Sequence, residues 1–146
     1  MMRNVTAVLL LMSNFPCAFG VEKLLVLDQP TVVVVYTPES ELKVGRTKEP
    51  GFVDFIDDFD WYRMQLVVKL RKQHVVKVIE SAALQIRFSK SKVMPIFRDS
   101  LGGFGFVVYV PGKAPVVFSG VATHQDVICT VQKLSGKHIG DIQCPH

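Results

Sequence analysis

The sequence lacks any apolar run long enough to cross a membrane. A spanning helix needs about 20 consecutive apolar residues, and the leading run of Val5 to Met12 (VTAVLLLM) is far shorter. The sequence also lacks internal repeats and low-complexity stretches, and its 146 residues suffice for one ordinary domain with a real core. Repetitive, fibrous and disordered architectures are therefore excluded.

The sequence has no large excess of positive or negative charge. The formal net charge is +4, which is too mild to indicate a nucleic-acid partner. The charges are unevenly distributed, since acids cluster between Asp54 and Asp60 while bases dominate from Arg63 to Arg98. Such an asymmetry most often marks solvated surface. The alternative is that it steers an acidic partner or an anionic membrane surface toward the protein.

Metal and cofactor motifs are missing. The histidines have no pairwise spacing typical of a zinc site, and the acids between Asp54 and Asp60 lack the alternation, central glycine and distal glutamate of a calcium loop. Gly102, Gly103 and Gly105 open an expected strand, whereas a phosphate-binding glycine loop follows a strand and opens a helix. We therefore predict neither a metal nor a cofactor.

Residues 1–20 contain the parts of a secretory signal peptide in the right order. Arg3 supplies the positive charge, an apolar region follows it, and the small residues Ala18 and Gly20 stand at −3 and −1 of a cleavage site after Gly20. We expect export and removal of this leader, which leaves a mature chain without a transmembrane segment. The alternatives are lipid attachment at Cys17 and a cytosolic protein whose first strand or helix is buried.

The expected location is extracytoplasmic, either the bacterial periplasm or the secreted fraction. No asparagine occurs after Asn14, so N-glycosylation lends no support to a eukaryotic secretory route. Without the leader, Cys129 and Cys144 are the remaining cysteines. An even pair in an oxidising compartment favours one disulfide, and the alternative is two independent thiols.

The hydrophobic pattern predicts an α+β fold, with a central, mostly antiparallel sheet and two main helices. The continuous run at 32–36 (VVVVY) indicates a central strand buried on both faces, and a weaker strand is expected at 21–27. Apolar residues at helical spacing predict a helix that begins near Asp57 or Asp58 and ends near Gln73.

After this helix the hydrophobic period changes to two. Alternating apolar residues predict a meander of antiparallel strands at 75–80, 84–88, 93–97, 104–110 and 115–121. Thr123 and Asp126 predict a capping box that opens the last helix, and Ser135-Gly136 ends it. We expect one domain over 21–136 and a tail at 137–146.

The order of these elements resembles the thioredoxin-like fold. The likeness is closest in 104–134 (FGFVVYVPGKAPVVFSGVATHQDVICTVQKL), which resembles that family's two terminal antiparallel strands, glycine-containing turn and closing helix. Redox-active members carry Cys-x-x-Cys between the first central strand and its helix, whereas residues 37–57 contain no cysteine. Gly102-Gly103 stand in place of the family's cis-proline. The resemblance therefore implies the fold without the dithiol chemistry.

Aromatic residues beside the expected surface loop at 38–51 are the best candidates for a binding site: Phe52, Phe55, Trp61 and Tyr62. Exposed together, they would form the kind of aromatic patch that anchors a protein partner. The alternative is that these large side chains belong to the core.

Three classes of function remain open on the sequence. The leading hypothesis is an exported, non-enzymatic binding or accessory protein that engages a protein partner through residues 38–62. The first alternative is a thiol–disulfide redox protein that uses Cys129 and Cys144. The second alternative is a divergent small hydrolase built on Asp57, Asp58 and His124. The sequence offers no nucleophile or oxyanion site for such an enzyme.

Overall fold

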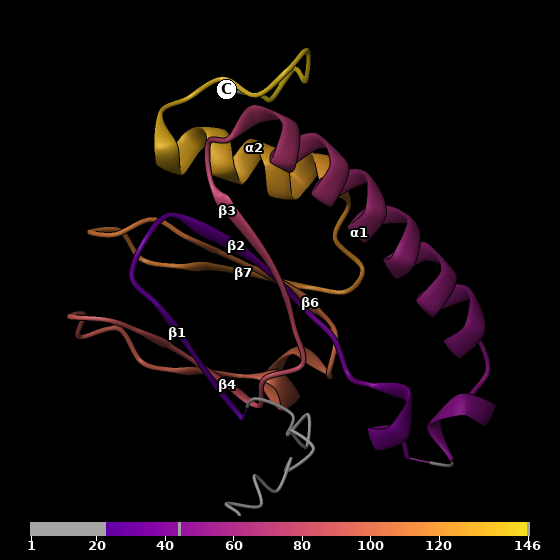
Figure 1. Cartoon of the computed structure of the whole chain (residues 1–146). Coiled ribbons are helices and arrows are strands. Elements are labelled where there is room, and N and C mark those ends of the chain that lie inside the picture. The colour runs from indigo at the N-terminus through magenta and orange to yellow at the C-terminus, as the bar shows by residue number, and fades with distance from the viewer. Residues whose placement is uncertain (1–22, 44, 146) are drawn as a thin grey trace, which may run out of the picture.

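The computed structural model describes residues 23–43 and 45–145 (Figure 1), so the predicted leader at 1–20 lies outside the described residues. Its central sheet consists of β2 (Thr31–Val35), β3 (Lys77–Ser81), β6 (Gly105–Tyr109) and β7 (Val116–Ser119). The strand order is β3-β2-β6-β7. β2 runs parallel to β3, while β6 runs antiparallel to β2 and to β7, so the sheet is mostly antiparallel as predicted.

β2 is buried on both faces because its valines point alternately to the two sides of the sheet. Val32 and Val34 join the core beneath the helices, whereas Val33 and Val35 join a second core on the opposite face. Each of these side chains is at most 1% exposed. The prediction of a central strand without a solvated face is confirmed.

A smaller sheet covers the second core. Its strands are β1 (Leu24–Leu27), β4 (Gln85–Phe88) and β5 (Ile96–Phe97), in the order β1-β4-β5. The predicted meander is wrong here, because β4 pairs with β1 and β5 and is not part of the β6–β7 sheet. The physical reason is burial: Leu27, Ile86 and Phe88 cover Val33 and Val35, which would otherwise face water.

Two helices cover the other face of the central sheet (Figure 1): α1 (Phe52–Gln73) and α2 (His124–Ser135). α1 begins at Phe52, earlier than the expected Asp57, because Gly51 adopts a left-handed φ of 78° and turns the chain into the helix. α2 opens with the predicted capping box, in which the Asp126 N–H donates to Thr123 Oγ1 at 3.2 Å. The α+β class is confirmed.

The residues after α2, expected as a tail, pack against that helix. Ile139 is 1% exposed and joins the core beneath the helices, and its N–H donates to Gln132 Oε1 at 2.8 Å. Cys129 of α2 and Cys144 are joined as a disulfide, with Cα atoms 5.4 Å apart. Within residues 23–43 and 45–145, no helix combines the length and the apolar character that crossing a bilayer demands.

Candidate functional site

A groove with a volume of about 570 Å³ lies at the carboxyl ends of β2 and β3, beside the first half of α1. It is named the α1 groove below. Ligands commonly bind at this end of parallel strands, because the chain leaves both strands for loops on the same edge. The opposite wall is the connection from β2 to α1, which holds the short 3₁₀ turns η1 (Glu39–Glu41) and η2 (Arg46–Lys48).

The floor of the α1 groove is apolar. Phe52, Ile56 and Phe59 recur at helical spacing, so α1 presents them on one face. Phe59 is 2% exposed, and its ring centroid lies 5.4 Å from that of Phe104 in an edge-to-face contact. Further apolar lining comes from Tyr36 and Leu42.

Hydrogen bonds hold the loops around the groove. Thr37 Oγ1 donates to Gly103 O at 2.9 Å, and Arg46 Nη2 donates to Gly102 O at 2.6 Å. Gly103 has a φ of 90°, and a Cβ there would lie 2.4 Å from Thr37 Oγ1, so this close approach requires glycine. The Arg46 guanidinium also lies 5.6 Å from the centroid of the Phe52 ring. These contacts therefore hold the walls of the α1 groove in place.

An ion pair between a buried arginine and a partly exposed glutamate holds the wall that contains η1. Arg98, in the 3₁₀ turn η3 (Arg98–Leu101), is 5% exposed and pairs with Glu41. Its Nη1 also donates to Ala82 O at 2.7 Å. Because a buried guanidinium is costly unless it is paired, this contact ties the connection from β2 to the body of the fold.

Carboxylates crowd the rim of the α1 groove. Asp60 and Glu80 accept hydrogen bonds from Arg63 at 3.2 and 2.5 Å. These partners raise the pKa of Arg63, chiefly through the hydrogen bond to Glu80, against an opposing effect of burial. Glu39 and Asp57 line the groove without an ion-pair partner among the described residues. The rim is therefore net negative above an apolar floor.

The aromatic residues singled out in the sequence do not form one patch. Phe52 lines the groove, and Phe55 lies beside it with the two ring centroids 6.4 Å apart. Trp61 is 55% exposed on another face of α1, and Tyr62 packs against the His124 ring of α2 at 5.9 Å. The structure therefore brings Phe52 and Phe55 together and places Trp61 and Tyr62 apart from them.

Trp61 nevertheless belongs to the surface around the α1 groove. It lines an adjoining hollow of about 380 Å³ that shares its charged residues with the groove: Asp57, Asp60, Arg63 and Glu80. Met64 and Val68 follow Trp61 at helical spacing and are 49% and 50% exposed. The groove and this apolar stripe form one continuous surface along α1 and the edge strand β3.

Sequence reasoning missed several residues of the groove that lie outside the expected binding region at 38–62, namely Tyr36, Glu80 and Phe104. Tyr36 and Thr37 directly follow the strand that is buried on both faces, and the carboxyl end of a central strand is a signal that points to such positions. Glu80 and Phe104 come from distant parts of the chain, and the pairing order of the sheet brings them to the groove.

Within the described part of the chain, no hydrogen bond links His124 to Asp57 or Asp58, the residues of the hydrolase hypothesis. His124 Nε2 lies 3.4 Å from Lys69 Nζ, further along α1 than either aspartate. Burial lowers the pKa of His124, the nearby Lys69 ammonium lowers it further, and Asp126 partly opposes both. The described contacts of this histidine connect α1 to α2.

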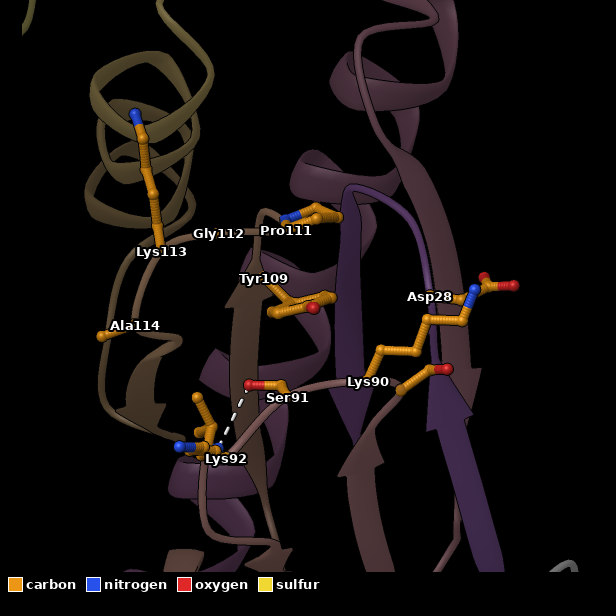
Figure 2. A pocket seen from close by; sticks show the side chains of 11 residues that line it. Asp28, Lys90, Ser91, Lys92, Tyr109, Pro111, Gly112, Lys113 and Ala114 are labelled. Atoms are coloured by element: carbon orange, nitrogen blue, oxygen red, sulfur yellow. Dashed lines mark hydrogen bonds between the residues drawn. The ribbon is translucent and has the colours of Figure 1, made fainter.

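A second hollow, of about 690 Å³, lies between the ends of the smaller sheet and the β6–β7 turn (Figure 2). Lysines surround it, yet they do not converge on one point. Lys113 extends toward α2, where its Nζ donates to Leu134 O at 2.5 Å, while Lys90 extends toward Asp28 (Figure 2). We therefore assign no ligand to this hollow.

A further hollow, of about 1160 Å³, lies beside the disulfide, between the end of α2 and residues 136–145. Gln132 Nε2 donates to Cys144 Sγ there at 2.7 Å. Across residues 23–43 and 45–145, no three His, Cys, Asp or Glu side chains gather in a group suited to a metal ion.

Comparison with known protein families, with curated proteins and with solved structures finds no match to this chain. Among the hollows described above, the α1 groove combines an apolar floor, a charged rim and walls held by hydrogen bonds.

Proposed function

We propose that the mature chain is an exported, non-enzymatic accessory protein that binds a protein partner through the α1 groove. The observation that carries this proposal is an aromatic floor beneath a rim of carboxylates, at the carboxyl ends of two parallel strands. Apolar area contributes affinity when a partner displaces water from it. The charged rim orients the partner and excludes acidic competitors.

The chemistry of the groove selects an apolar side chain next to a lysine or arginine. The apolar side chain packs against Phe52 and Ile56 on the floor, and the basic neighbour pairs with Glu39 or Asp57, whose carboxylates have no ion-pair partner among the described residues. A hollow of about 570 Å³ suits one short segment of a partner.

The contact surface extends from the groove along α1. A stable protein–protein interface buries about 800 Å² on each partner, so a partner also needs surface beyond the groove. The exposed stripe of Trp61, Met64 and Val68 is directly adjacent to the groove. Because tryptophan is enriched among the residues that dominate binding energy, Trp61 is the expected anchor of this outer part.

The resemblance to the thioredoxin-like fold forms part of the proposal. The strand order β3-β2-β6-β7, with both helices on one face, supports it. In redox-active members of that family, Cys-x-x-Cys lies between the first central strand and its helix. In this chain the corresponding connection at 36–51 lines the α1 groove and contains no cysteine. A position used for dithiol chemistry in the family would serve here for binding.

Site-specific photo-cross-linking in the native host tests the proposal. A photoreactive residue in place of Val53, which lines the groove and is 64% exposed, should capture a protein. The captured segment should carry lysine or arginine beside an apolar residue. The control is the same replacement at Val117, which is 42% exposed on β7, the opposite edge strand of the sheet. Equal capture at both positions, or capture at neither, would contradict the proposal.

A further inference from the structure

The outer face of the smaller sheet is apolar and exposed. The strand register places Leu24, Gln85 and Phe97 in one row across β1, β4 and β5, and Val26 beside Arg87 in the next row. These side chains alternate with those of the buried second core, so they point away from the protein. Val26 is 54% exposed and Phe97 is 51% exposed. Both helices lie on the other side of the central sheet (Figure 1).

The neighbourhood of this outer face adds apolar and basic side chains. Met94, in the loop before β5, is 79% exposed, and Leu84, just before β4, is 40% exposed. Among the described residues of the smaller sheet and its loops, exposed bases outnumber exposed acids, with Lys23, Arg87, Lys90 and Lys92 against Asp28 and Asp99. The α1 groove has the opposite character, since its rim is acidic.

We propose that the outer face of the smaller sheet docks on an anionic phospholipid bilayer. Phe97 and Met94 enter the boundary between headgroups and acyl chains. Arg87 keeps its aliphatic stem in the apolar layer while its guanidinium reaches the lipid phosphates. In this orientation the α1 groove faces water, because it lies in the helical layer on the far side of the central sheet.

Charge and shape favour a bilayer over a second copy of the chain or another protein. Arg87 lies on β4, the central strand of the smaller sheet, so a two-fold interface centred on this strand would bring two Arg87 side chains together. A protein partner anchors large side chains in pockets, and the four hollows described above, which lie among residues 28–145, are lined by other residues than Leu24, Val26 and Phe97. An apolar face with basic residues suits the surface of an anionic membrane.

Vesicle co-sedimentation tests whether the protein docks on membranes in this way. The protein used is the form that accumulates in its native host. Wild-type protein should bind vesicles of equal parts phosphatidylcholine and phosphatidylglycerol more tightly than vesicles of phosphatidylcholine. Arg87→Gln should weaken binding to the anionic vesicles about fivefold, as expected for one charge near such a surface. Phe97→Ser should weaken binding about tenfold, because part of a large apolar side chain no longer leaves water.

The matched controls are Arg71→Gln and Met64→Ser, which make similar changes on the exposed surface of α1. Both should bind vesicles as the wild type does. Equal losses in Arg87→Gln and Arg71→Gln would overturn the proposal, since net charge would then explain the binding. Failure of the wild type to bind either vesicle would overturn it as well. The vesicle result does not depend on the α1 groove, so this proposal and the proposed function succeed or fail separately.

Discussion

Removal of the disulfide between Cys129 and Cys144 should lower the free energy of unfolding by about 3 kcal/mol. The bond joins residues separated by 15 positions, and the loss of loop entropy in the unfolded chain gives about 3 kcal/mol for a loop of that length. The loop includes the last turns of α2 and Ile139, which is 1% exposed. The bond therefore restrains an ordered part of the fold.

Urea denaturation of the oxidised wild type and of the double variant Cys129→Ala, Cys144→Ala measures this free energy directly. A second variant, Ile139→Ala with the disulfide intact, should lose about 2–5 kcal/mol because it leaves a cavity in the core. A loss below about 1 kcal/mol in the double variant would refute the reasoning from loop entropy. A small loss in Ile139→Ala would refute the packing of the residues after α2.

The same cysteine pair separates the binding proposal from the redox alternative. A structural disulfide has a reduction potential below about −300 mV and resists the glutathione pool, whereas catalytic bridges are reduced more readily. Equilibration with glutathione buffers, followed by alkylation and mass measurement, should leave the Cys129–Cys144 bond intact. A bridge that opens in these buffers would support thiol–disulfide chemistry.

Three further variants test the packing and the charges. Gly103→Ala should lower stability by about 1–3 kcal/mol, because its Cβ is strained at this φ and approaches Thr37 Oγ1; an unchanged thermal midpoint would contradict the close approach. Glu41→Ala should lower the free energy of unfolding by about 1–3 kcal/mol, because Arg98 stays buried without its carboxylate while Glu41 itself is partly exposed; a much smaller loss in urea would mean that Arg98 reaches water. His124 has a lowered pKa, so the unfolded chain binds its proton more readily and stability should decline as pH falls below about 6.5, until the folded pKa is reached. His124→Gln should remove that decline, and a wild-type pH profile in this variant would exclude His124 as its source.

The sequence predicted those helices and strands whose burial or ends depend on their own residues. The valines of β2 required burial on both faces, and the capping box at Thr123 and Asp126 marked the start of α2. The start of α1 was missed because the conformation of Gly51 moves it to Phe52. The pairing of the strands was harder to predict from the sequence. Apolar and polar residues alternate in β4 as in any half-buried strand, and β4 pairs with β1 because the two strands together cover the second core.

The candidate site could be predicted in part. Phe52 was identified as one of the aromatic residues beside the expected surface loop at 38–51. Glu80 and Phe104 were not, since their approach to α1 depends on the order of strands in the sheet and not on local pattern. Trp61 and Tyr62 are neighbours in sequence, yet the turn of the helix points them to different surroundings.

The most direct measurement of the central claim is the affinity of the cross-linked partner for two isosteric variants, Asp57→Asn and Asp58→Asn. Both remove one exposed carboxylate from the same turn of α1, but Asp57 lines the α1 groove and Asp58 does not. Calorimetric titration should show binding about two- to fivefold weaker for Asp57→Asn and unchanged for Asp58→Asn. Equal affinities for both variants and the wild type would contradict a role of the groove in binding.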